Sequence, residues 1–209
     1  MRMRRKSGLD SRIERCERFI VTEPEKYYGH WLEDTVFNEL HIELGCGKGL
    51  FTAEKAKSEP DTLLVGLEKI SNVLVIALER AMQEDLQNVR YINRLADDIL
   101  SFFAANEVSR IYLNFSDPWP ARRHAKRRLT GERFLEIYKN ILRSGGEIHF
   151  KTDNLPLFEF SLSEFKHCGF TLSEISYNLH ESEIAGILTD YESKFYEQEI
   201  PINRCIAIV

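Results

Sequence analysis

The chain has 209 residues, of which 43% are hydrophobic and 29% charged, and its formal net charge is −5. This length suits a single domain that buries a sizeable core. No apolar run is long enough to cross a bilayer, and no apolar segment of a secretion signal follows the basic start MRMRRKSGLD. We therefore expect a cytoplasmic protein with no membrane partner.

The positive charge is concentrated in two segments. Residues 1–6 carry four basic side chains and residues 122–128 carry five, and neither segment holds an acid. Concentrated cations form the kind of surface that attracts phosphate groups, so the negative net charge does not exclude a nucleic-acid partner. The four cysteines form no Cys-x-x-Cys pair, and we expect reduced thiols and no metal site.

Residues 1–30 are polar and mixed, and we interpret them as a basic N-terminal extension before a single domain over 31–209. From residue 39 onward, apolar runs alternate with stretches of helical spacing. Strands are predicted at 40–44, 62–68, 88–93, 110–115, 145–152 and 170–179, with further strand character toward the C-terminus. Helices are predicted at 50–57, 71–83, 97–106, 131–142 and 155–169. This alternation predicts an α/β fold with a mostly parallel sheet and helices on both faces.

A glycine-rich turn follows the first strand, in the sequence ELGCGKG. Gly45 and Gly47 allow a tight turn and a close approach of the backbone to a ligand, although the spacing is not that of a dinucleotide fingerprint. Glu68 ends the second strand, where an acid can accept hydrogen bonds from both hydroxyls of a ribose. With Glu43 directly before the turn, these acids favour a nucleoside that carries a positive centre, such as S-adenosylmethionine, over NAD.

The third strand leads into a turn where the adenine of such a nucleoside would lie. Backbone groups near Leu95 could bind the edge of the base. Asp97 is either a side-chain partner of the adenine or the N-cap of the next helix, and we favour the cap.

The fourth strand runs into NFSDPWPARRHAKRR. Asp117 is expected at the rim of the ligand crevice, in a turn that two prolines stiffen. Trp119 offers a stacking face for a base, or packs into the core. A run of basic side chains follows, and we expect it to bind phosphates. Its members are Arg122, Arg123, His124, Lys126, Arg127 and Arg128.

Together these motifs carry a resemblance to a known family. IELGCGKG, NFSDPWP with the basic run ending in KRRLT, IHFKTDN and TDYESKF occur in the order found in the bacterial tRNA (guanine-N7-)-methyltransferases. The resemblance covers the chain from about residue 40 to its end. It implies a Rossmann-like methyltransferase fold with an antiparallel C-terminal strand, S-adenosylmethionine as cofactor, and methylation of a guanosine N7 in the variable loop of tRNA.

The resemblance also assigns roles to residues. It implies cofactor contacts from Glu43, Glu68, Asp117 and the position of Leu95, a catalytic role for Asp117, and substrate contacts from Asp153, Thr189, Tyr191 and Glu192. Two positions depart from the family pattern. Ala121 stands where lysine is usual, and Leu95 stands where an acid is usual.

The chemistry expected of such a site is simple. Guanine N7 has a free lone pair at neutral pH, so no general base is needed, and catalysis consists mainly of positioning. A fixed carboxylate would stabilise the positive charge that develops on the base, and Asp117 is the first candidate. Two alternatives remain at this point: a Rossmann oxidoreductase, and a tRNA-binding module without catalysis. A monomer and a homodimer are both compatible with the sequence.

Overall fold

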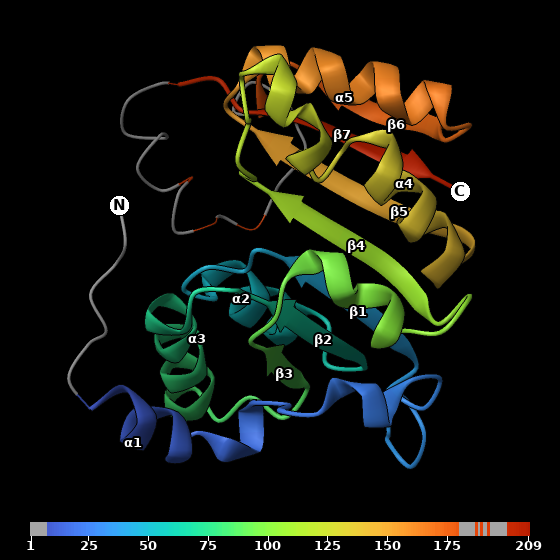
Figure 1. The fold of residues 1–209 in the computed structure, drawn as a ribbon. Coiled ribbons are helices and arrows are strands. Elements are labelled where there is room, and N and C mark those ends of the chain that lie inside the picture. The colour runs from blue at the N-terminus through green and yellow to red at the C-terminus, as the bar shows by residue number, and fades with distance from the viewer. Residues whose placement is uncertain (1–7, 180–186, 188, 190–191, 193–199) are drawn as a thin grey trace.

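The computed structural model describes residues 8–179, 187, 189, 192 and 200–209. Its centre is a seven-stranded sheet in the order β3-β2-β1-β4-β5-β7-β6 (Figure 1). The strands are β1 (Glu39–Leu44), β2 (Thr62–Leu67), β3 (Val89–Ile92), β4 (Val108–Asn114), β5 (Leu142–Thr152), β6 (Thr171–Ser176) and β7 (Asn203–Ile208). β7 alone runs in the opposite direction to the other six strands. The predicted α/β fold with an antiparallel C-terminal strand is confirmed.

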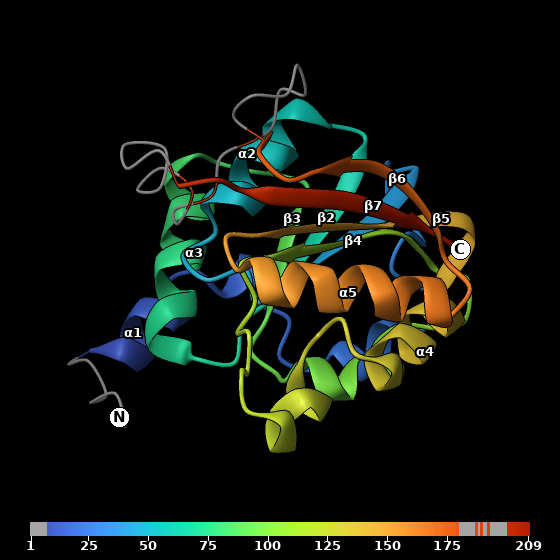
Figure 2. The same cartoon turned by 90° about the horizontal axis from the view of Figure 1, so that it is seen from above.

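The helices cover both faces of the sheet (Figure 2). One side carries α1 (Leu9–Glu14), α2 (Leu50–Ser58) and α3 (Ser71–Gln83), and the other carries α4 (Glu132–Ile141) and α5 (Leu155–His167). Four short 3₁₀ helices complete the described part: η1 (Glu17–Phe19), η2 (Pro24–Tyr27), η3 (Ala96–Ser101) and η4 (Arg122–Arg127). None of the described helices is long and apolar enough to cross a membrane.

The sheet separates two apolar clusters, and alternate residues of β2 belong to different clusters. Leu63, Val65 and Leu67 pack with the α4 and α5 side, whereas Leu64 packs with the α2 and α3 side. All six residues of β2 are buried. A strand covered on both faces needs a continuous apolar run, which is why the run TLLVGL predicts a strand.

The helix predicted at 97–106 is wrong in type and extent, because the structure has only the 3₁₀ helix η3 there. Side chains from outside the predicted helix bind backbone groups that a longer helix would use. The Trp31 indole donates to the Phe102 carbonyl at 2.8 Å, and the Glu107 carboxylate accepts from the Ala104 N–H at 2.7 Å. Asn106 adopts a left-handed φ of 61°, which ends any helical path.

The first described residues are packed against the sheet side that carries α3. Arg12 of α1 forms an ion pair with Glu79 of α3, with 2.6 Å between Nη2 and Oε2. Phe19 is buried, and the Val21 N–H donates to the Tyr91 carbonyl of β3 at 2.8 Å. The region before β1 therefore contributes to the core from α1 onward.

Candidate active site

A cavity of about 710 Å³ opens at the carboxyl ends of the parallel strands. This is where ligands bind in open α/β sheets. Eight of the residues singled out from the sequence line it: Gly45, Glu68, Leu95, Asp97, Asp117, Trp119, Lys126 and Arg127. The structure thus brings together residues from four separate strand ends and from η4 around one space.

The glycine turn after β1 closes over the end of β2. The N–H groups of Gly45 and Cys46 both donate to the Leu67 carbonyl, at 2.8 and 3.0 Å. Gly45 and Gly47 have φ values of 83° and 58°, and a Cβ on either residue would meet nothing within 4 Å. The turn therefore needs glycine for its left-handed backbone and leaves the space above it free for a ligand.

The backbone around Glu68 holds its carboxylate at the cavity wall. One oxygen accepts from the Gly47 N–H at 3.3 Å, and the other accepts from the Ile70 N–H at 2.8 Å. The Asn93 amide donates to the Glu68 carbonyl at 2.7 Å and so ties the turn after β2 to the turn after β3. A half-buried carboxylate fixed in this way is a suitable acceptor for the two hydroxyls of a ribose.

Glu43 lies beneath the glycine turn rather than in the cavity lining. It is 3% exposed, and it accepts hydrogen bonds from the Thr52 hydroxyl and from the Asn114 amide, the latter at 3.0 Å. Burial, together with the charges of Glu43 and Glu68, raises the pKa of the Cys46 thiol well above its ordinary value. The turn is thus backed by negative charge, which suits a cationic ligand group.

Asp117 stands between two residues with left-handed backbone. Phe115 has a φ of 51° and Trp119 a φ of 42°, and the Asp117 side chain between them is exposed. No described residue makes a hydrogen bond or ion pair with that carboxylate. Trp119 is half-buried, and the Arg127 guanidinium lies 4.8 Å from its ring centroid. The ring is therefore not part of the buried core, and one of its faces is already stacked on a cation.

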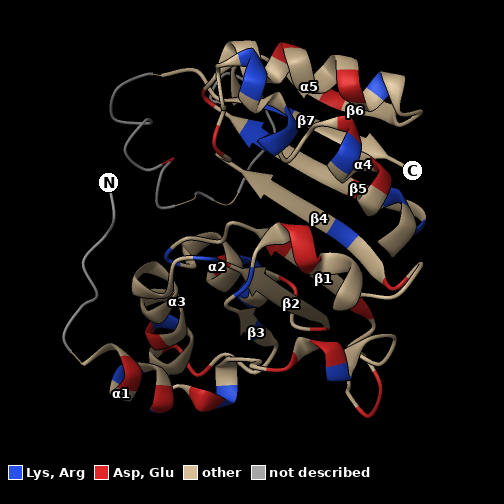
Figure 3. Ribbon diagram, viewed as in Figure 1, with Lys and Arg blue, Asp and Glu red and all other residues tan. Residues whose placement is uncertain are grey.

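The basic run forms η4, the short yellow-green helix beside α5 in Figure 1, and Figure 3 shows the charge that it carries. Four of its cations are exposed: Arg122, Arg123, Lys126 and Arg127. His124 and Arg128 are half-buried. Ala121, where the family usually has lysine, is exposed and caps the helix N-terminus without a side-chain hydrogen bond.

The preference for Asp97 as an N-cap is wrong. Leu95 occupies the cap position of η3 and makes no side-chain cap bond. Asp97 lies in the first turn instead, and its carboxylate pairs with Arg133 of α4 at 2.6 Å. Both residues line the cavity, and the pair therefore spans its rim between β3 and α4.

The remaining predicted substrate residues come from the end of β5 and from the segment before β7. Asp153 is exposed just after β5. Thr189 and Glu192 exchange hydrogen bonds: the Glu192 N–H donates to the Thr189 hydroxyl at 2.9 Å, and the Thr189 N–H donates to the Glu192 carboxylate at 3.2 Å. This is the reciprocal pattern of a Thr-x-x-Glu capping box. Tyr191 lies outside the described residues.

Glu192 also forms a buried ion pair with Lys151 of β5, at 3.2 Å. Burial lowers the pKa of Lys151, and the neighbouring Glu192 opposes this shift. The sequence reasoning missed Asn114, Lys151 and Arg133. Asn114 and Lys151 are polar residues at the carboxyl ends of β4 and β5, directly after the short apolar run IYL and after Phe150, and that position is the signal that could have identified them.

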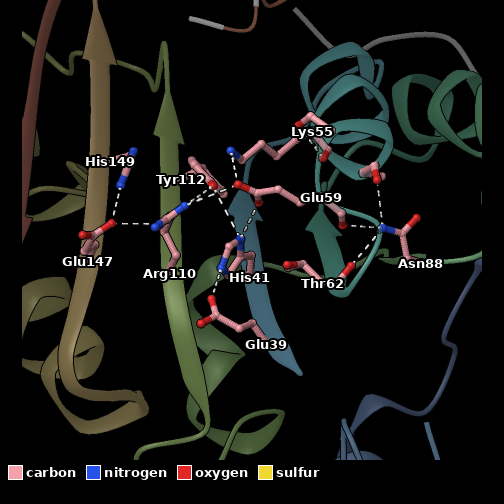
Figure 4. Close-up of polar contacts among 12 residues, drawn as sticks. Glu39, His41, Lys55, Glu59, Thr62, Asn88, Arg110, Tyr112, Glu147 and His149 are labelled. Carbon is pink, nitrogen blue, oxygen red and sulfur yellow. Dashed lines mark hydrogen bonds and ion pairs between the residues drawn. The ribbon is translucent and has the colours of Figure 1, made fainter. Parts of the chain in front are cut away.

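A second polar cluster lies on the same sheet but away from the cavity (Figure 4). Arg110 of β4 donates to Glu147 of β5 at 2.9 Å, and His149 pairs with the same carboxylate at 2.7 Å. Burial, its largest cause, lowers the pKa of His149 to about 4. His41 of β1 is buried beside Glu39, and its pKa is also lowered by burial. Among the described residues, no group of His, Cys, Asp or Glu side chains is placed to hold a metal ion.

Comparison with known proteins assigns the family. The model of the methyltransferase family Methyltransf_4 matches residues 38–205. The tRNA (guanine-N(7)-)-methyltransferase of Geobacillus thermodenitrificans is 44% identical over 100% of this chain and 97% of its own length. The enzyme of the same name from Bacillus cytotoxicus is 45% identical over 98% and 95%. The chain belongs to the tRNA (guanine-N7-)-methyltransferase family. It is therefore an enzyme of the methyltransferase class, which removes the oxidoreductase alternative.

Solved structures agree on the fold. The 16S rRNA methyltransferase KamB superposes with a TM-score of 0.64 at 15% identity and covers 83% of this chain and 89% of its own. An S-adenosylmethionine-dependent methyltransferase from Aquifex aeolicus gives a TM-score of 0.57 at 13% identity, with 98% and 100% coverage. The expected Rossmann-like methyltransferase fold is confirmed, and with it S-adenosylmethionine as the cofactor of the family.

The residues of the cavity fit that cofactor. The open space above Gly45 and Gly47 leaves room for a ligand to approach the backbone, and two backbone donors hold the Glu68 carboxylate at the cavity wall. The buried charge of Glu43 lies behind the turn. A cationic nucleoside is the ligand class for which this combination of an open glycine turn and two acids is suited.

Proposed function

We propose that the protein transfers the methyl group of S-adenosylmethionine to N7 of a guanosine in the variable loop of tRNA. The single observation that carries this proposal is the position of Asp117. Its exposed carboxylate lines the cavity that also holds Glu68, and it sits directly before the cationic helix η4. The residues after β1 and β2 thus suit the cofactor, and those between β4 and α4 suit RNA.

Bound S-adenosylmethionine supplies an electrophilic methyl group on a sulfonium. The protein's own task is to hold the guanine so that N7 faces that group, because a correctly aligned encounter removes a large part of the barrier. Asp117 is the group that we assign to this task. A carboxylate there can accept hydrogen bonds from the N1–H and exocyclic amine of guanine, and it stabilises the positive charge that the base gains.

The cations of η4 serve to attract and orient the tRNA backbone. The four exposed side chains of this helix, Arg122, Arg123, Lys126 and Arg127, present charge without an acidic partner in the described structure. Such contacts are independent of RNA sequence. They weaken as the salt concentration rises, because the counterions released on binding then enter a more concentrated solution and gain less entropy. Asp153, Thr189, Tyr191 and Glu192 are proposed to contact the substrate, and Leu95 to contact the adenine through its backbone.

The test is incubation of the purified protein with an unmodified tRNA transcript and methyl-labelled S-adenosylmethionine. Borohydride and aniline treatment then cleaves the RNA chain at 7-methylguanosine, so the position of the cut identifies the base. We expect label and a cut in the variable loop, and neither in a transcript whose variable-loop guanosine is replaced by adenosine. Absence of label at low salt would overturn the proposal, and a cut elsewhere would overturn its site.

A further inference from the structure

Arg128 differs from the other cations of the basic run in where its guanidinium lies. Its Nε donates to the Pro118 carbonyl and its Nη2 to the Trp119 carbonyl, both at 3.1 Å. The guanidinium carbon also lies 4.2 Å from the centroid of the Phe160 ring on α5. Arg128 is therefore half-buried and directed back into the protein.

These contacts fix the turn that carries Asp117 from its C-terminal side. The N-terminal side is fixed independently, because the Phe115 N–H donates to the Lys151 carbonyl of β5 at 2.9 Å. Between these two anchors, Phe115 and Trp119 both have left-handed φ values, which bulky residues rarely adopt without external support. Asp117 itself gains no support from hydrogen bonds of its side chain to the described residues.

We propose that Arg128 is a positioning residue for Asp117 and not a phosphate contact. This inference rests on the proposed function, in which Asp117 holds the guanine. The guanidinium of Arg128 joins the DPWP turn to α5. The conformation of this turn then sets the direction of the Asp117 carboxylate. Sequence reasoning counted Arg128 with the RNA-binding cations because charge alone does not show which way a side chain points.

Arginine is specifically suited to this role. Its planar guanidinium presents donors in a fixed fork, so it can serve two carbonyls while its face stacks on an aromatic ring. Lysine keeps the charge but has a point-like ammonium on a flexible stem, and it cannot make both contacts in the same geometry. Arg128→Lys therefore separates charge from position at one site.

The kinetic test compares Arg128→Lys with Arg122→Ala, which removes an exposed cation of the same helix. For Arg128→Lys we expect kcat at saturating tRNA to fall by about 10- to 100-fold, as misplacement of a catalytic group does. The salt dependence of the tRNA KM should stay at the wild-type slope. For Arg122→Ala we expect a higher tRNA KM and a flatter salt slope. Arg143→Lys is the control for replacing an arginine by a lysine. Arg143 lies at the start of β5, where it pairs with Glu39.

A second measurement needs no tRNA and no turnover. The chain has two tryptophans, and Trp31 is 3% exposed, so acrylamide quenching of the native protein reports mainly on Trp119. We expect Arg128→Lys to increase the quenching and shift the emission to the red, while Arg143→Lys leaves both unchanged. Circular dichroism confirms that each variant is folded before either measurement.

Two results would overturn the inference. One is an Arg128→Lys enzyme with normal kcat, raised tRNA KM and a flattened salt slope, because that is the signature of a phosphate contact. The other is tryptophan quenching identical to wild type, because the turn would then be held without Arg128. Should the wild-type protein fail to methylate tRNA, the proposed function falls, and the fluorescence comparison still decides whether Arg128 holds the turn.

Discussion

The Asn114 amide at the end of β4 donates to the Glu43 carboxylate of β1, with 3.0 Å between Nδ2 and Oε1. Both side chains sit beside the carboxyl edge of the sheet, one strand apart. The bond connects Glu43, which lies beneath the glycine turn, to the strand that leads into Asp117. The two halves of the proposed site, cofactor and substrate, thus share a partly buried polar contact.

Removing that amide leaves a buried carboxylate with one fewer donor. We expect Asn114→Ala to lower the free energy of unfolding by about 1.5–3 kcal/mol, the contribution of a hydrogen bond to a charged group. Asn140→Ala is the matched control, because Asn140 is exposed on α4, and its loss should stay within about 0.5 kcal/mol. Urea unfolding measures both. Equal losses for the two variants would show that the Glu43 contact contributes little.

Gly49 is tightly enclosed at the start of α2. Its φ is 77°, and a Cβ there would lie 2.6 Å from the Ala77 Cβ and 2.9 Å from the Tyr91 hydroxyl. Gly145→Ala imposes the same left-handed backbone, φ 72°, in open space, and should cost about 1 kcal/mol. Gly49→Ala should cost about 1–3 kcal/mol more than that, from overpacking. Thermal unfolding of the two variants measures the difference, which should vanish if α3 moves away freely.

Asp117→Ala should reduce methyl transfer by about 100- to 1000-fold, the usual cost of losing one group that stabilises developing charge. Its unfolding free energy should change by less than about 0.5 kcal/mol, because the side chain is exposed. Asp117→Asn keeps the shape and an acceptor oxygen but removes the charge, so its rate of methyl transfer should lie between those of wild type and Asp117→Ala. A labelled-methyl assay and urea unfolding give the two quantities, and near-normal turnover of Asp117→Ala would refute the assigned role.

His149 predicts how stability depends on pH. Its pKa is about 4 in the folded protein against an ordinary 6.5, and burial is the main cause. Above pH 6.5 the histidine is neutral in both states. Between pH 6.5 and about 4 the unfolded chain binds a proton that the folded chain does not, so the free energy of unfolding falls as the solution becomes more acidic.

His149→Gln removes this titration and keeps a polar group beside Glu147. The variant should therefore lose less stability than wild type as the pH falls through that window. Urea unfolding midpoints over a pH series measure the effect. His41→Gln provides a comparison on the neighbouring polar contact, where burial also lowers the histidine pKa. A steeper pH dependence in His149→Gln would contradict the neutral, buried state of the imidazole.

The Lys151–Glu192 pair should be more sensitive to the loss of one partner than of both. The side chains are 8% and 1% exposed, so Lys151→Met leaves a carboxylate buried without its cation, at a cost of about 3–5 kcal/mol. Lys151→Met combined with Glu192→Gln removes both charges, keeps an acceptor for the Thr189 N–H, and should lose less. A double-mutant cycle by urea unfolding measures the coupling. Additive losses would indicate that the pair is solvated.

The sequence predicts the sheet well and the site unevenly, for physical reasons. Interior strands such as TLLVGL identify themselves because burial on both faces demands a continuous apolar run. The helix expected at 97–106 is wrong because the indole of Trp31, 71 residues away in the chain, binds the Phe102 carbonyl, and the carboxylate of Glu107 binds the Ala104 N–H. The spacing of apolar residues within 97–106 contains neither partner.

Some residues of the site could be predicted from the sequence and others could not. Their positions at strand ends correctly predicted that Glu68 and Asp117 lie at one cavity. The direction of a side chain was not predictable: Arg128 reads as a phosphate ligand but points at two carbonyls, and Asp97 reads as a cap but pairs with Arg133. Glu192 reads as a substrate residue, yet its carboxylate lies buried against Lys151. Its contact with RNA remains a prediction.

The antiparallel direction of β7 has an evolutionary consequence. Because β6 runs with β5 and β7 runs against both, the connection between Ser176 and Asn203 starts and finishes at the cavity edge of the sheet. A hydrogen bond from the Leu179 N–H to the Ile202 carbonyl, 2.8 Å long, closes its two ends together. Because this bond and the pairing of β6 with β7 hold both ends, the length of chain between residues 179 and 202 can change in evolution without altering the order of the strands.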